Sequence, residues 1–224
     1  MYRLLNHRFL YLIPLLLSAI FSLRAFRLKC PKPYRLYAWM LLLSLFTEVL
    51  ALAWKWELYH WGSFNFSKNN FWIYNFFLIL RFGLLAMIFN LTLYHHKLIP
   101  LIGGIIFLFG LLDYTFIHGP LQFNTYSMIL THVCIITLCL LYFRQLLQEP
   151  GIIAIQKEPL FWMVIGLFFY HAVSLPFLIN LGFFNLQNYR LTAYFFPINE
   201  ALNFLLCSCY LISFLWKPQY SQPL

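Results

Sequence analysis

The sequence predicts an all-α integral membrane protein, a bundle of seven transmembrane helices forming a single domain over residues 1–224. Of the 224 residues, 62% are hydrophobic and 9% are charged, and the mean hydropathy is +0.75. Soluble domains are about half apolar and about a quarter charged. This composition therefore excludes a soluble enzyme, a disordered chain and a small disulfide-stapled domain.

Seven apolar segments have the length that a membrane span needs, about 20 residues for about 30 Å of hydrocarbon at about 1.5 Å per residue. They lie near residues 7–25, 36–56, 71–94, 98–117, 125–144, 160–180 and 194–216. In the first of these, the apolar stretch from Phe9 to Leu23 follows Arg3 and Arg8 and resembles a signal-peptide core, but residues 22–25 make a poor cleavage site. We therefore expect a retained helix there.

The later segments carry residues that shape helices. Gly103-Gly104 and Gly110, spaced seven apart, favour close contact with another helix. Pro176 and Pro197 each free a backbone carbonyl and favour a bend. No alternating pattern of the β-barrel kind occurs. The longest connection, residues 145–159, leaves no room for a soluble output domain.

The basic residues predict the orientation. The chain has 15 Lys and Arg against 6 Asp and Glu. Most flank apolar segments, where positive charge orients helices and contacts lipid headgroups, so we expect the bilayer and no nucleic acid as partner. The face with more basic residues includes one short, strongly basic loop: Arg24, Arg27, Lys29, Lys32 and Arg35. The positive-inside rule then places the N-terminus outside and the C-terminus in the cytoplasm, in a multi-pass protein of a bacterial inner membrane.

Six ionisable residues lie inside the apolar segments, where each costs about 2.5–3.5 kcal/mol to insert. Counted from the outer end of each span, they lie within roughly 10 Å of one another along the membrane normal, in the outer half of the bilayer. With one neighbouring asparagine they form a predicted polar pocket: Glu48, Arg81, Asp113, His132, His171, Glu200 and Asn203. We expect Glu48 to pair with Arg81. The groups either lock the helices together or line a ligand site, and their number favours the ligand site.

His132 and His171 allow two further interpretations, a metal site completed by Asp113 or Glu200, or a b-type haem between the two histidines. No HxxxH, HExxH or CxxCH motif supports either, so we expect no metal and no cofactor. The cysteines are odd in number and lack CxxC spacing, which indicates small apolar fillers. They are Cys30, Cys134, Cys139, Cys207 and Cys209.

Two stretches carry a family resemblance. Residues 159–170 have the form P-x-F-W-x-x-x-G-x-x-x-Y, and residues 199–206 read NEALNFLL. With the seven-span layout, they resemble the membrane regions of bacterial seven-transmembrane sensor proteins, including those that precede histidine kinase domains. The resemblance implies an input in the bundle and a signal passed to the cytoplasm through the last helix. Only eight residues follow Trp216, so we expect a separate signalling partner.

The function expected from these observations is a membrane sensor or ligand-binding module. It responds to an unidentified small ligand or to a proton. An enzyme acting on a lipid or other apolar substrate, with a carboxylate and a histidine as acid and base and with or without a metal, is an alternative. A small transporter or a structural subunit of a membrane complex also remains open.

Overall fold

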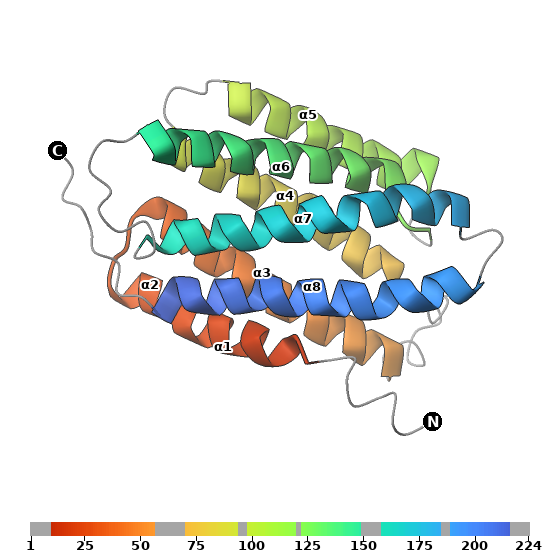
Figure 1. Cartoon of the computed structure of the whole chain (residues 1–224), viewed down its shortest axis with the longest axis horizontal. Coiled ribbons are helices and arrows are strands. Elements are labelled where there is room, and N and C mark those ends of the chain that lie inside the picture. The colour runs from red at the N-terminus through yellow and green to blue at the C-terminus, as the bar shows by residue number, and fades with distance from the viewer. Residues whose placement is uncertain are drawn as a thin grey trace. The chain divides into compact units, whose positions relative to one another are not determined.

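The computed structural model describes residues 10–56, 70–93, 98–119, 122–148, 158–184 and 189–215, except for the side chains of residues 180–184 and 189–196. All regular structure in these ranges is helical, which confirms the all-α prediction (Figure 1). The helices are α1 (Leu12–Ser22), α2 (Arg24–Arg27), α3 (Lys32–Trp56), α4 (Phe71–Thr92), α5 (Leu98–Leu112) followed by a π-helical turn (Asp113–Ile117), α6 (Thr125–Gln148), α7 (Pro159–Phe184) and α8 (Tyr189–Leu215).

Six stretches of helix are long and apolar enough to cross a membrane. They are Lys32–Lys55, Phe71–Thr92, Leu98–Ile117, Thr125–Gln148, Pro159–Ile179 and Pro197–Leu215. These six correspond to the second to seventh predicted segments. Their helices extend beyond the predicted bounds at some ends, with α3 beginning at Lys32 and α8 at Tyr189. The chain is therefore a multi-pass membrane protein.

The first predicted segment is shorter in the structure. Helices α1 and α2 are separated only by Leu23, which itself has helical angles of φ −60° and ψ −23°. Even a continuous helix over residues 12–27 rises only about 24 Å, which is less than the hydrocarbon thickness of about 30 Å. Residues 7–9 of the predicted segment lie outside the described residues. A seventh span, and the side of the membrane on which each terminus lies, stay predictions.

The turn after α2 is a Schellman motif, in which two backbone amides reach back to carbonyls of the last helical turn. The N–H of Cys30 donates to the carbonyl of Ala25 at 3.0 Å, and the N–H of Lys29 donates to the carbonyl of Phe26 at 3.3 Å. Lys29 has a φ of +49°, at the position where glycine is usual. A lysine here holds a strained backbone conformation.

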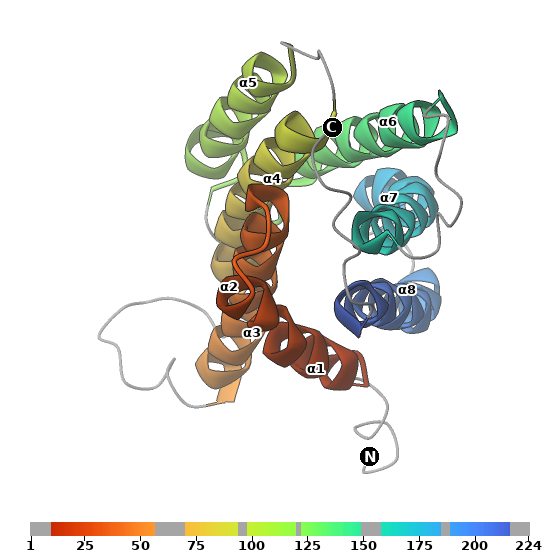
Figure 2. The same ribbon diagram turned by 90° about the vertical axis from the view of Figure 1, so that its left-hand side faces the viewer.

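Internal contacts divide the chain into two compact units, residues 31–131 and residues 1–30 with 132–224. In the unit 31–131, α4 packs against both α3 and α5 (Figure 2). A Cβ on Gly103 would lie 3.0 Å from the Cβ of Ala86, and one on Gly110 would lie 3.1 Å from Ile79 Cγ1. The predicted small-residue contact is confirmed for these two glycines. Gly104 makes no such contact, since nothing lies within 4 Å of its added Cβ.

The opposite face of α5 is apolar and exposed. Its exposed side chains include Leu101, Ile105, Leu108 and Leu112. Their spacing of three or four residues places them on one stripe of the helix. In water such a stripe would be costly, whereas hydrocarbon is its natural solvent. This stripe supports lipid contact for α5.

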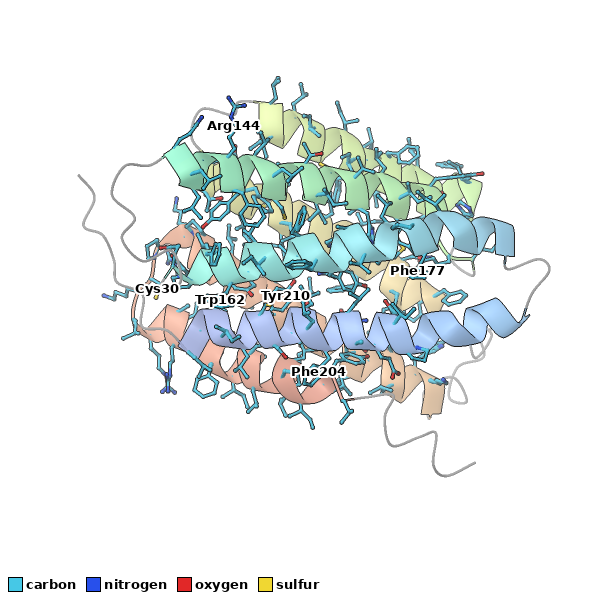
Figure 3. The ribbon with its side chains drawn as sticks, in the orientation of Figure 1. Cys30, Arg144, Trp162, Phe177, Phe204 and Tyr210 are labelled. Carbon is cyan, nitrogen blue, oxygen red and sulfur yellow. The ribbon has the colours of Figure 1, made fainter. Side chains whose placement is uncertain are left out.

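In the other unit, α8 packs against both α7 and α1. The backbones of α7 and α8 approach closely at Gly166, where an added Cβ would lie 2.7 Å from the Cβ of Cys209. Cys209 is buried here and acts as a small packing side chain. Figure 3 shows the side chains, with Tyr210 of α8 buried and Phe204 of the same helix 47% exposed.

Candidate functional site

The structure brings together two of the predicted site residues, His132 of α6 and His171 of α7. Their ring centroids are 4.3 Å apart, with an angle of 74° between the ring planes. Both side chains are almost completely buried, with exposures of 1% and 2%. Tyr170 lies beside them, its ring centroid 6.3 Å from that of His132. Two titratable rings are therefore in edge-to-face contact inside a unit built from membrane helices.

Helix α7 is weakened next to this histidine pair. Pro176 has no N–H, so the helical hydrogen bond to the carbonyl of Ala172 is missing. The hydroxyl of Ser174 donates to the carbonyl of Tyr170 at 2.6 Å, a back-bond that often bends helices. Both features lie within five residues of His171, so the predicted bend-prone site adjoins the pair.

The pair does not fit a haem. Imidazoles on opposite sides of one iron have centroids about 6 Å apart, since each nitrogen lies about 2 Å from the metal and each centroid about 1 Å further. The observed 4.3 Å is shorter, and the rings meet edge to face. Within the described ranges, no three or more His, Cys, Asp and Glu residues come together as a possible metal site.

Glu48 of α3 makes a hydrogen bond that was not predicted from the sequence. The hydroxyl of Tyr74 in α4 donates to Glu48 Oε2 at 3.0 Å. Glu48 and Arg81 are both partly buried, and their mutual pairing stays a prediction. Tyr74 lies seven residues before Arg81, on the same side of α4. From that spacing, Tyr74 could have been predicted to belong to the same site as Arg81.

Asp113 is fully buried and uses both carboxylate oxygens. Oδ1 lies 2.5 Å from Nδ1 of His118, and Oδ2 accepts a hydrogen bond from the backbone N–H of Ser127 at 2.8 Å. Ser127 is the third residue of α6, where backbone amides lack helical partners and the helix dipole favours negative charge. Asp113 therefore caps α6 and also holds His118.

The contact of His118 with Asp113 could not be predicted from α-helical geometry. Five residues along an α-helix correspond to a rotation of about 140° away from the starting side chain. Residues 113–117 instead form a π-helical turn, in which the N–H of His118 bonds the carbonyl of Asp113 at 3.0 Å. Such turns are rare and frequently occur at functional sites. The wider turn brings His118 back over Asp113.

Asn75 of α4 anchors the segment that leads into α6. Its Nδ2 donates to the carbonyl of Gln122 at 2.6 Å, and its Oδ1 accepts from the N–H of Asn124 at 3.3 Å. The Asn75 side chain is fully buried. An uncharged residue 47 positions away from its partner leaves no recognisable pattern in one sequence, so this anchor could not have been predicted.

The two remaining predicted residues, Asn203 and Glu200, both lie on α8. Asn203 donates from Nδ2 to the carbonyl of Asn199 at 2.9 Å, within its own helix. Glu200 is partly buried. Glu48, Arg81 and Asp113 belong to the unit 31–131, and the other four predicted residues belong to the second unit. Their gathering into one polar pocket stays a prediction.

A small cavity lies within the unit 31–131, with a volume of about 20 Å³. Its lining is mostly apolar, with hydroxyls only from Ser127 and Thr131, and it includes none of the predicted pocket residues. This volume holds about one water molecule. The cavity is therefore too small for an organic ligand.

Comparisons of this chain with protein-family models, with curated proteins and with solved structures found no match. The class that the structure supports is a multi-pass, all-α membrane protein. Assignment to the seven-transmembrane sensor regions remains a proposal.

Proposed function

We propose that the protein is a sensor module of a bacterial inner membrane, in which a proton or small ligand acts at His132 and His171. A separate signalling protein receives the output. The observation that carries this proposal is the contact of two buried histidine rings, 4.3 Å apart, beside a weakened part of α7. The family resemblance supports the same class.

The histidine pair is sensitive to charge. A positive charge on one buried ring costs several kcal/mol unless a partner offsets it. Two positive charges 4.3 Å apart repel each other by about 4 kcal/mol at an effective dielectric constant of about 20. A ligand that binds or protonates these rings therefore favours a wider spacing of α6 and α7. The proton or ligand shifts the equilibrium between the close and the wide spacing of α6 and α7, because it binds more tightly to the wide one.

The tight contact between α7 and α8 provides a route for the signal. Gly166 allows the two backbones to approach so closely that a single added carbon would overlap Cys209. Packed helices with such a contact move together, since the contact leaves no space for independent sliding. A bend in α7 near Pro176 would displace α8, the helix that the resemblance identifies as the output.

Hydrogen exchange of the full chain in lipid nanodiscs tests the proposal. Exchange is measured at about pH 8 and about pH 5.5, a range that spans histidine titration, with times corrected for the chemical exchange rate. We expect amides near residues 172–176 to exchange faster at the lower pH, and both His132→Phe and His171→Phe to abolish that change. Tyr170→Phe, which keeps both imidazoles, is the matched control and should respond like the wild type. An unchanged response in both histidine variants would refute the proposal.

A further inference from the structure

We infer that Asp113 and His118 form a proton-transfer site at one boundary of the membrane, in which Nε2 of His118 accepts a proton from a water molecule. This site lies in the unit 31–131 and does not depend on the histidine pair of the other unit. It would give the protein a general base, the group that an enzyme of the membrane interface needs to activate water.

The carboxylate determines which ring nitrogen is the base. An ionised carboxylate only accepts hydrogen bonds, so Nδ1 of His118, at 2.5 Å from Asp113 Oδ1, carries the hydrogen. In a neutral ring Nε2 then holds the lone pair. Because Oδ2 is held by the Ser127 N–H, the carboxylate cannot rotate away from the imidazole. A buried acid that orients a histidine in this way is the arrangement that prepares imidazole bases in hydrolytic enzymes.

His118 is also accessible. Its side chain is 18% exposed, whereas Asp113 is fully buried. It directly follows the apolar stretch Leu98–Ile117, so it lies where a membrane span ends. A base at this position is within reach of water, unlike the buried histidines 132 and 171.

Helix capping alone does not account for the cluster. A cap on α6 needs only the bond from the Ser127 N–H to one carboxylate oxygen of Asp113. The second oxygen of Asp113 contacts His118 instead. Asn124, in the same segment, is 2% exposed, and its Oδ1 and Nδ2 have no hydrogen-bond partner among the described residues. Buried amides without partners are rare in proteins. Asn124 therefore carries an uncommitted donor and acceptor three residues before Ser127, whose N–H bonds Asp113.

The proposed step is a proton transfer from water to the imidazole of His118. The O–H bond of water breaks, its electron pair stays on oxygen, and the proton forms a bond to Nε2. The resulting imidazolium is stabilised by the negative charge of Asp113. Among the described residues, the ring of Tyr126 also lies beside His118, with 5.0 Å between the two ring centroids. Return of the proton from the imidazolium to the hydroxide restores both water and the neutral ring, and no oxidant or reductant takes part.

Labelling with diethyl pyrocarbonate, which acylates unprotonated imidazole nitrogen, tests the site in the full chain. Mass spectrometry reads each histidine separately. We expect His118 to react at least about tenfold faster than His132 and His171. We expect Asp113→Asn to slow the reaction of His118 about tenfold, since the ring then loses the carboxylate that holds its orientation and keeps the lone pair on Nε2. Thr115→Val, which removes an exposed hydroxyl in the same turn that bonds its own helix, is the matched control and should leave the rate unchanged.

A measurement on the wild-type protein covers the case in which Asp113→Asn does not fold. Nitrogen-15 NMR of histidine-labelled protein, with His118→Gln used to assign the signal, reports which ring nitrogen carries the hydrogen. Hydrogen on Nδ1 and a lone pair on Nε2 would support the site. Hydrogen on Nε2 would overturn it. Equal labelling of His118 in wild type and a folded Asp113→Asn variant would also overturn it.

Discussion

Replacing Gly166 by alanine is the sharpest test of the contact between α7 and α8. Carbon atoms in contact normally lie about 3.5–4.0 Å apart, whereas the new Cβ would lie 2.7 Å from the Cβ of Cys209. Both atoms are attached directly to the backbone, so neither can rotate away. The helices must therefore separate by about 1 Å at this point, at the expense of their packing.

The expected cost follows from two opposing terms. Overpacking a well-filled contact costs about 1–3 kcal/mol, and the upper half of this range applies because the overlap involves no flexible side-chain end. Alanine in a helix is more favourable than glycine by about 1 kcal/mol. We therefore expect Gly166→Ala to lower the free energy of unfolding by about 1–2 kcal/mol.

Titration of the protein from mild detergent into dodecyl sulfate, followed by circular dichroism, measures this free energy. Gly104→Ala is the matched control, because nothing lies within 4 Å of its added Cβ, and it should be neutral or slightly stabilising. Adding Cys209→Gly should recover stability in the Gly166→Ala background, whereas Cys209→Ala, which keeps the Cβ, should not. Equal stabilities of Gly166→Ala and Gly104→Ala would refute the reasoning.

Two further substitutions test local features by the same titration. Asn75→Ala removes hydrogen bonds to Gln122 and Asn124 and should cost about 1–3 kcal/mol, whereas Asn90→Ala, at an exposed position of the same helix, should stay within about 0.5 kcal/mol of wild type. Equal effects of the two would argue against the Asn75 anchor. Lys29→Gly relieves a φ of +49° and should add about 0.5–1 kcal/mol. Lys29→Ala retains a Cβ and should add nothing, so a similar gain from both would contradict the strain argument.

The helices and their apolar character could be predicted from the sequence. A chain in hydrocarbon must satisfy its backbone internally, so a run of about 20 apolar residues is sufficient to predict a helix. All six long helices were predicted in this way. The spacing of Gly103 and Gly110 also predicted a close helix contact, because residues seven apart share a helix face. The first segment stays a predicted span, since α1 and α2 together cover only residues 12–27.

The candidate site could be predicted only in part. Counting residues along each span showed that His132 and His171 lie at similar depth, because depth depends only on the rise per residue. Their contact depends on how α6 and α7 are rotated, which a sequence that is apolar on nearly every face does not reveal. The bond from Asp113 to His118 depends on a π-helical turn, which the expected α-helical periodicity conceals.

The amino-acid sequence by itself therefore determined where the helices lie along the chain and which polar residues they carry, since both follow from local hydropathy and length. Tertiary structure decided which of those residues meet. Gly166 and Cys209 are 43 positions apart and are brought together by the packing of α7 against α8. Such contacts depend on the rotation of each helix about its own axis, which is determined by side-chain packing rather than by the apolar content of the span.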